Sequence, residues 1–256
     1  MTAMTHFTNR WITALVSGAL MGVLSACGEQ NLFDSLSDHD TAAAKIEAAQ
    51  IAVDNGDFTA AIATLETLCG TDSSAPTCDA DTAALLGSAY AGRAGLNVFD
   101  LIATVTNTAP GTTSSFSSFS TLLPDPTVNN KNDLHDAVAL LSSLANPTPN
   151  QSPELAVVAM ADIVVTVGVD LTNGFDPTTG VPNTVPTLTD VQNAETASGT
   201  VTQVSNDIDL VVQGVTGSGL ANEDITNDIN QVEDAIDTDQ DGTVSAAELQ
   251  AFLASL

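Results

Sequence analysis

The chain has 256 residues, 43% of them hydrophobic, and a mean hydropathy of +0.18. That share is enough for a buried core and excludes a disordered polyanion, although 32 acidic residues against 4 basic ones give a net charge of −28 at pH 7. A field of this sign repels phosphate backbones and anionic lipid headgroups, so we expect neither nucleic-acid binding nor electrostatic docking to a membrane. Cations are the natural partners, while the same acidity also keeps an exported protein soluble.

The amino terminus has the layout of an export signal. A short polar stretch with one positive charge, Arg10, precedes an apolar run over residues 11–24 that is short for a membrane-spanning helix. Directly after it, Leu24-Ser25-Ala26-Cys27 resembles the lipobox of bacterial lipoproteins at all four positions. The resemblance implies a signal peptide over residues 1–26 and a membrane anchor of acyl chains on Cys27. The alternative is an ordinary cleaved signal followed by a chance cysteine.

The residue after the lipidated cysteine bears on the destination of a lipoprotein. In that family an aspartate there favours retention in the inner membrane, whereas this chain has Gly28. We therefore expect a lipid-anchored protein of the bacterial cell envelope, in the outer membrane rather than the inner one where there are two. Residues 27–40 are polar and are predicted to be a tether between the anchor and the first helix.

The number of cysteines agrees with export. The chain has three, and with Cys27 assigned to lipid, Cys69 and Cys78 remain as a pair. An oxidising compartment would join these two in a disulfide across the turn-rich segment 70–77. Metal binding is a poor alternative because no histidine is near them in the sequence, and the chain has no CxxC redox motif.

Residues 41–54 and 58–68 are predicted to be two helices joined by a turn. Gly56-Asp57-Phe58, followed by Ala61 and Leu65, resembles the turn and second helix of a tetratricopeptide repeat. Leu86-Gly87, with Tyr90 three residues on, resembles the first helix of a following repeat, where glycine lets neighbouring helices approach closely. Ala48 departs from the family, which has leucine there, so a generic helical hairpin is the alternative.

The middle of the chain is predicted to hold a loop and two further helices. Residues 110–126 are rich in Ser, Thr and Pro and form a loop with apolar residues, packed over the core or offered to a partner. Residues 132–145 form a short helix. Ser152 then caps a strongly apolar helix that begins at Pro153 and runs to Leu171.

The apolar segment 153–171 also resembles a transmembrane helix or a strand in its composition. Glu154, Asp162 and Asp170 interrupt it, and unpaired carboxylates are costly at membrane depth, so it is predicted to be a central core helix rather than a transmembrane one. The β-branched residues 163–167 would also suit a strand, but the length of the segment and its capping favour a helix.

A loop over residues 173–186 separates this helix from the last ones. Apolar residues then recur at spacings of three and four from Val201 to Val215, which predicts an amphipathic helix that ends at residues 216–219. The same rhythm from Ile225 to Ile236 predicts a final helix that leads into an acidic loop. We therefore expect an all-α fold of helical hairpins packed around a central apolar helix, with a helical domain over 41–215 and a calcium-binding segment over 220–256.

The segment 237–248 resembles the calcium-binding loop of the EF-hand family at every diagnostic position. Ca²⁺ prefers six to eight hard oxygen ligands, which alternate carboxylates on a tight loop can supply. Gly242 permits the bend and Val244 is the apolar anchor. The resemblance implies six ligands: the side chains of Asp237, Asp239 and Asp241, the backbone carbonyl of Thr243, Ser245 directly or through water, and Glu248 in bidentate fashion. The alternative is a solvated acidic turn.

The predicted hand has no visible partner. EF-hands usually pair through the residues around Val244, and the sequence holds no second loop of this kind. The hand is flanked by the predicted helices Ile225–Ile236 and Ala246–Leu256, with Leu249, Phe252 and Leu253 facing inward. It must therefore pack on the helical domain, dimerise or remain a weak site.

Patterns typical of catalysis are almost absent from the sequence. After the signal only His39 and His135 remain, neither in a GxSxG or cysteine context, and His135 is predicted to lie at the surface. Three basic residues and no phosphate loop argue against an anion site, so we do not expect an enzyme. The favoured function is a lipid-anchored, calcium-binding helical adaptor for another envelope protein. Two alternatives are a solute-binding or transport accessory lipoprotein and a structural component of the cell surface.

Overall fold

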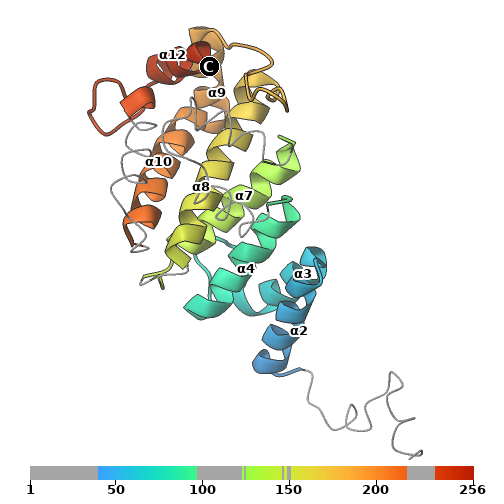
Figure 1. Ribbon diagram of the computed structural model, residues 1–256. Coiled ribbons are helices and arrows are strands. Elements are labelled where there is room, and N and C mark those ends of the chain that lie inside the picture. Colours follow the sequence, from blue (N-terminus) through green and yellow to red (C-terminus); the bar gives the residue numbers. More distant parts are fainter. Residues whose placement is uncertain (1–39, 97–122, 124, 146, 149–150, 218–233) are drawn as a thin grey trace, which may run out of the picture. The chain divides into compact units, whose positions relative to one another are not determined.

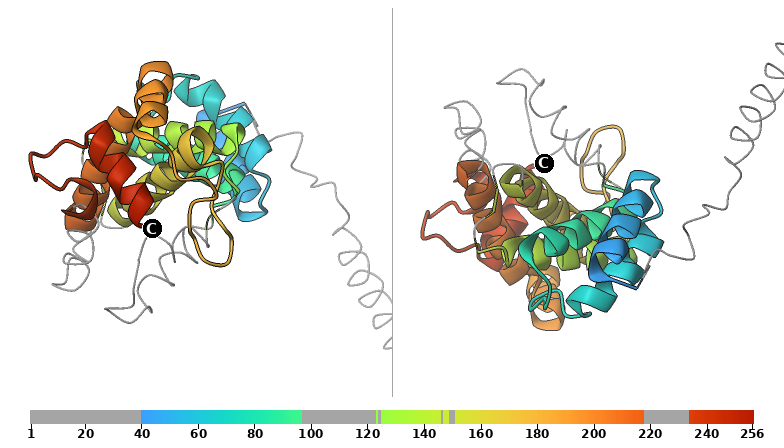
Figure 2. Two further views of the ribbon diagram at one scale, coloured as in Figure 1. Left: turned by 90° about the horizontal axis from the view of Figure 1, so that it is seen from above. Right: turned by 90° about the horizontal axis from the view of Figure 1, so that it is seen from below.

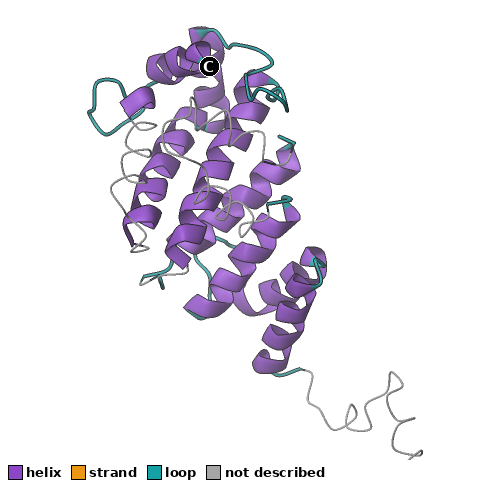
Figure 3. Cartoon of the chain, in the orientation of Figure 1, coloured by secondary structure: helices purple, strands orange, loops and turns teal. Residues whose placement is uncertain are grey.

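The computed structural model describes residues 40–96, 123, 125–145, 147–148, 151–217 and 234–256. In these residues every named element is a helix, and the β-structure is confined to one isolated bridge between Phe175 and Pro182 (Figures 1 and 3). The predicted all-α fold is therefore confirmed. The described residues from Lys45 onward belong to one compact unit, which takes in those of the predicted calcium-binding segment and those of the predicted helical domain after Ala44.

Several predicted features lie outside the described residues. They are the signal peptide 1–26, the lipidation site Cys27, the tether except for Asp40, most of the loop 110–126 and the helix from Ile225 up to residue 233.

The first two helices have the predicted bounds to within one residue. They are α2 (Ala42–Asp54) and α3 (Phe58–Cys69). In the turn between them Gly56 has a φ of 76°, a left-handed conformation that glycine adopts without a Cβ clash. The carboxylate of Asp57 then accepts the backbone N–H of Ala60 at 3.2 Å and caps α3. These helices are as expected, while the tetratricopeptide resemblance itself stays a prediction.

The cysteine pair closes the loop that follows α3. The sulfurs of Cys69 and Cys78 lie 1.99 Å apart and their Cα atoms 4.5 Å apart. The backbone N–H of Thr77 also donates to the carbonyl oxygen of Cys69 at 2.9 Å, which returns the loop to the end of α3. The carboxylate of Asp79 accepts the N–H of Thr82 at 3.0 Å and starts the next helix. The structure thus brings together the two cysteines that the sequence paired.

Helix α4 (Ala80–Arg93) packs against α7 (Val128–Ser142). A Cβ on Gly87 would lie 3.1 Å from Cγ of Leu141, so the close helix approach predicted at this glycine is confirmed. Arg93 joins the two helices as well, because its Nε and one terminal nitrogen donate to the two carboxylate oxygens of Asp133 at 2.8 and 2.6 Å.

The predicted bounds of α7, residues 132–145, were wrong at both ends. The helix begins at Val128, because the Thr127 hydroxyl accepts the N–H of Asn130 at 3.2 Å and caps it, and it ends at Ser142. Its first turn holds the exposed Val128 and three polar residues, and the apolar periodicity used for the prediction starts only at Leu134.

Helix α8 (Gln151–Val167) passes directly into a π-helical turn, η3 (Gly168–Thr172). The predicted cap at Ser152 was wrong: this serine is buried within the first turn, and Thr148 precedes the helix and accepts the N–H of Gln151 at 3.4 Å. The predicted end at Leu171 falls in the π turn, where Gly168 leaves room for the ring of Pro126.

The apolar side chains of this helix are mostly buried in the core. Gln151–Thr172, with a mean hydropathy of 2.0, is the one helix among the described residues that is long and apolar enough to cross a membrane, and 78% of its apolar window is buried. It packs against both α7 and α10 (Figures 1 and 2). This is the environment predicted for a central core helix.

Helix α9 (Leu188–Ser198) was not predicted. Val191 is its one buried residue, so it has no apolar stripe that periodicity could detect. Its signal is instead a capping box, in which Thr187 and Asp190 each accept the other's backbone N–H, at 3.3 and 2.9 Å. Helix formation here depends on the cap and on packing against α10, η3 and the last helix, α12 (Ala246–Ser255).

Helix α10 (Thr200–Gly217) has the predicted extent and buried face. Val201, Val204, Ile208 and Val211 are buried and Val215 is half-buried, and the described part of the helix extends to Gly217, within the residues 216–219 expected to end it. It approaches α8 closely at Gly214, where a Cβ would lie 2.6 Å from the carbonyl oxygen of Ser152 and 2.8 Å from Cβ of Ala156. Only a residue without a side chain fits this contact.

Gly214→Ala is expected to destabilise the fold. An unhindered glycine-to-alanine change in a helix stabilises it by about 0.5–1 kcal/mol, whereas here the methyl group meets a backbone oxygen and must push α10 away. Overpacking of this kind costs about 1–3 kcal/mol, which urea unfolding would measure. Asn206→Ala, on the exposed side of α10, is the control and should leave stability nearly unchanged. Wild-type stability in Gly214→Ala would contradict the close contact.

Removing the Cys69–Cys78 bridge is expected to lower the free energy of unfolding by about 2–3 kcal/mol, because the cross-link restricts a short loop in the unfolded chain. The comparison is between oxidised wild type and the double variant Cys69→Ser/Cys78→Ser. Mass spectrometry of peptides from the exported protein without reductant should show the two cysteines linked. Free thiols at both positions would contradict the bridge.

Candidate metal centre

The acidic loop lies between Ile236 and α12, at the carboxyl end of the chain. Two residues have positive φ, Gln240 at 56° and Gly242 at 82°, and they turn the loop back on itself. The bend predicted at Gly242 is therefore present, and it lets residues at both ends of the loop face the same space.

Three of the predicted ligands come together. Asp237, Asp239 and Glu248 each have a carboxylate oxygen within 4.8 Å of those of the other two. Asp237 and Asp239 come from the start of the loop and Glu248 from the first turn of α12. The convergence joins residues that are eleven positions apart in the sequence.

Asp237 is the buried member of this group. Its side chain is only 5% exposed, and its Oδ2 accepts the backbone N–H of Gly242 at 2.9 Å across the loop. Its Oδ1 is buried without a hydrogen-bond partner, the single side-chain atom in this state among the described residues. A buried acceptor without a donor is costly, and a cation would supply what is missing.

Glu248 connects the beginning and the end of the loop. Its Oε1 accepts the backbone N–H groups of Thr238 and Asp239 at 2.8 and 3.2 Å, and its Oε2 accepts the N–H and hydroxyl of Ser245 at 2.9 and 2.8 Å. The Ser245 hydroxyl in turn accepts the N–H of Glu248 at 3.3 Å, which completes a capping box on α12. The same glutamate thus starts the helix and shapes the loop.

The other implied ligands make contacts of their own within the loop. The Oδ1 of Asp241 accepts the N–H and the hydroxyl of Thr243 at 2.9 and 2.6 Å. The backbone N–H of Asp241 donates to Oδ1 of Asp239 at 3.3 Å. Asp241 is therefore not in the converging group, and the Ser245 hydroxyl is engaged with Glu248. Ion coordination by Asp241 or Ser245 would require these local bonds to be exchanged.

The electrostatics of the loop follow from this crowding. The pKa of Asp239 is raised, first by the negative charge of Asp241 and then by its partial desolvation and the charge of Glu248. Hydrogen bonds from Ser245 lower the pKa of Glu248 to about 2. At neutral pH the loop therefore carries several negative charges that repel one another.

The loop is attached to the helical core. The backbone N–H of Val244 donates to the hydroxyl of Ser205 in α10 at 3.1 Å, and α12 packs against α9. Leu249, Phe252 and Leu253 are buried, as predicted, and so is Ile236. Of the three arrangements left open for a single hand, packing on the helical domain is the one observed. Ser205 was not predicted, because a serine on the polar side of an amphipathic helix has no distinguishing signal.

In comparisons with known proteins, no family model, no curated protein and no solved structure matches the chain. Conclusions about the site therefore depend on its own residues and geometry.

Proposed function

We propose that the chain is a lipid-anchored protein of the bacterial cell envelope that binds Ca²⁺ through its C-terminal loop and serves as an adaptor for another envelope protein. Calcium binding is the part best supported by geometry. The observation that carries it is the buried, unpartnered Oδ1 of Asp237, which lies in a group with the carboxylates of Asp239 and Glu248.

The chemistry of the donors supports calcium over other metals. All the candidate ligands are oxygens, and hard cations such as Ca²⁺ and Mg²⁺ prefer oxygen, whereas zinc and copper sites use histidine or cysteine. Asp237, Asp239 and Glu248 would hold the ion, and the EF-hand resemblance adds Asp241, the Thr243 carbonyl and Ser245. Such a ligand set is larger and more flexible than the octahedral shell that Mg²⁺ demands.

A bound ion would stabilise the carboxyl end of the fold. It would remove the mutual repulsion of the loop carboxylates and satisfy Asp237, and both ends of the loop are joined to buried residues of the core. Folding and binding should therefore be coupled, with calcium in a structural role. Extracellular modules of this kind bind calcium at about 10⁻⁴–10⁻³ M.

Calcium is expected to raise the stability of the mature chain. A tenfold excess of the ion over its Kd contributes about 1.4 kcal/mol and raises Tm by a few degrees. Glu248→Gln should lose most of this gain, because it removes a charge from the implied bidentate ligand. Magnesium should give a smaller effect. Calorimetric titration and thermal unfolding with and without calcium measure both quantities.

The matched control for this experiment is Glu47→Gln, an exposed glutamate of α2 outside the loop, which should keep the full response to calcium. Asp237→Asn tests the buried position separately, since it keeps the shape of the side chain while removing its charge. No heat and no change in melting at several millimolar calcium would mean that the loop is only an acidic turn.

The membrane anchor is supported by the lipobox-like Leu24-Ser25-Ala26-Cys27. Cys27→Ser is expected to move the protein from the membrane fraction to the soluble fraction, because the acyl chains would be its membrane contact. Fractionation with salt and carbonate washes measures this. Retention of the variant on washed membranes would call for a spanning or protein-mediated anchor instead.

A further inference from the structure

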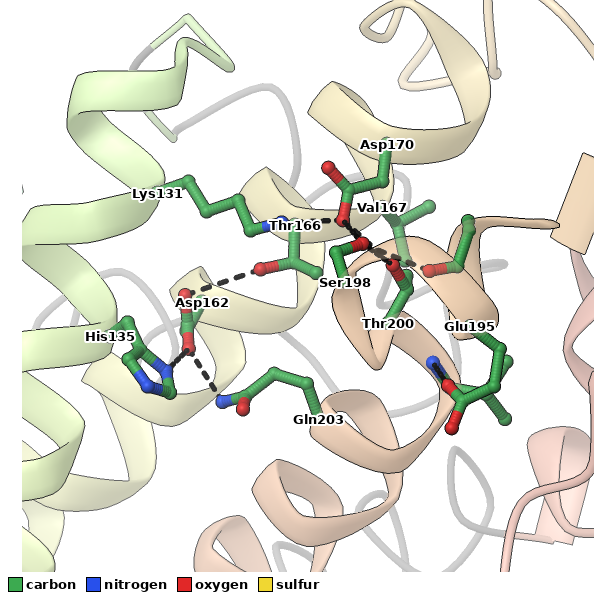
Figure 4. A network of polar contacts seen from close by, with 12 residues as sticks. Lys131, His135, Asp162, Thr166, Val167, Asp170, Glu195, Ser198, Thr200 and Gln203 are labelled. Atoms are coloured by element: carbon green, nitrogen blue, oxygen red, sulfur yellow. Dashed lines mark hydrogen bonds and ion pairs between the residues drawn. The ribbon is translucent and has the colours of Figure 1, made fainter. Parts of the chain in front are cut away.

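Two aspartates face each other in the core, outside the acidic loop. Asp162 of α8 and Asp207 of α10 are both 0% exposed. The side-chain amide of Gln203, one turn before Asp207, donates to Oδ2 of Asp162 at 3.0 Å and lies 3.1 and 3.0 Å from the two carboxylate oxygens of Asp207. One amide nitrogen thus bridges two carboxyl groups across the α8–α10 contact. Figure 4 shows its bond to Asp162.

The remaining groups around the pair supply little positive charge. Asp162 accepts the Thr166 hydroxyl at 3.4 Å, and Nδ1 of His135, from α7, lies 3.8 Å from its Oδ2. Arg93 and Lys131 are ion-paired to Asp133 and Asp170. Within the described residues no lysine or arginine is hydrogen-bonded or ion-paired to either carboxyl of the pair.

Two ionised carboxylates in this position would be strongly unfavourable. Each would be desolvated, and each would repel the other at short range in a medium less polar than water. One proton removes both costs, since a protonated carboxyl can donate to its ionised neighbour. The Thr166 hydroxyl donates to one oxygen of Asp162, and the two hydrogens of the Gln203 amide cannot satisfy the three oxygens that remain. The geometry therefore lacks one donor, which this proton would supply.

We propose that Asp162 and Asp207 form a buried proton-binding site that holds α8 against α10 and makes the stability of the helical unit depend on pH. The proton resides on Asp207. Asp162 faces two further polar groups, the imidazole of His135 and the hydroxyl of Thr166.

The pKa values agree with this distribution. The pKa of Asp207 is raised well above its ordinary value, first by burial and then by the charge of Asp162, while the bond from Gln203 opposes the shift. The pKa of His135 is raised, first by its interaction with Asp162. The His135 side chain is 58% exposed, as predicted for a surface residue, yet it reaches a fully buried carboxylate.

The other titratable groups on the surrounding elements have separate partners or lie farther out. On α7, Asp136 and Lys131 influence His135, and Lys131 is paired with Asp170 of η3. On α9, Glu195 accepts the first N–H groups of α10 at Val201 and Thr202. On α8 itself, Glu154 accepts the hydroxyl of Ser88.

The sign of the pH dependence follows from the raised pKa of Asp207. In the unfolded chain this carboxyl ionises near the usual aspartate pKa, whereas in the folded chain it keeps its proton to higher pH. Its contribution to stability is therefore complete below the ordinary pKa and is lost as pH rises toward the folded pKa. In that window folding takes up one proton, so the unfolding equilibrium constant increases by about tenfold per pH unit from this group.

The test is urea unfolding of the mature chain from pH 5 to 9 at a fixed calcium concentration. Asp207→Asn mimics the neutral carboxyl at every pH, so its unfolding constant should rise less steeply than that of wild type, by up to tenfold per pH unit, and it should be the more stable protein at high pH. Asp209→Asn, an exposed aspartate two residues along α10, is the matched control and should keep the wild-type slope.

A spectroscopic measurement keeps the proposal testable if Asp207→Asn does not fold. Infrared spectra of wild type at pH 6, above the ordinary pKa of aspartate, should show the C=O stretch of a protonated, buried carboxyl group. Asp162→Asn offers a second variant, because it removes the neighbouring charge and should lower the pKa of Asp207. Equal pH slopes for wild type and Asp207→Asn, or no carboxylic acid band in the wild type at pH 6, would overturn the proposal.

Discussion

The packing of α8 on α10 is the contact on which the rest of the structure depends. Helix α8 is buried nearly all round, and α10 approaches it so closely at Gly214 that no side chain fits between them. On the opposite side of this contact α7 joins α8 to α4 and thereby to the amino-terminal helices. Beyond α10 lie α9, α12 and the acidic loop. A change in the spacing between α8 and α10 would displace Ser205, whose hydroxyl accepts the N–H of Val244 in the candidate metal centre.

The second constraint is electrostatic, because the chain has 32 acidic and only 4 basic residues. Cations are too few to pair with the carboxylates, and many acids instead accept backbone N–H groups at helix amino termini, as Asp57, Asp79, Asp190 and Glu195 do. There they also face the positive end of the helix dipole. Arg93 and Lys131 join α4, α7 and η3 by ion pairs. Two groups of acids lie close together instead, the Asp162–Asp207 pair and the carboxylates of the loop 237–248, and for these we propose a proton and a calcium ion.

The acidic loop differs from a free-standing turn in how it is attached. Its first residue is buried, its last lies in the first turn of α12, and the backbone N–H of Val244 donates to α10. The loop therefore packs on the helical unit, where a paired EF-hand would use a second loop. Because Ile236 and Leu249 on either side of the loop are buried in the core, a change of charge in the loop would alter the stability of the core.

Local sequence determined most helices of the described part, because caps and apolar periodicity act over a few residues, as at Asp57 and along Val201–Val211. It also determined the cysteine pair, the bend at Gly242 and the carboxylates available to a metal. It failed for α9 and for the ends of α7 and α8, where polar first turns or a buried Ser152 removed the periodic signal. Only the tertiary structure decided that Asp162 meets Asp207, that Ser205 holds Val244 and that Asp237 is left with a buried, unpartnered oxygen. These juxtapositions join helices far apart in the sequence, and their energies depend on burial, which no local pattern specifies.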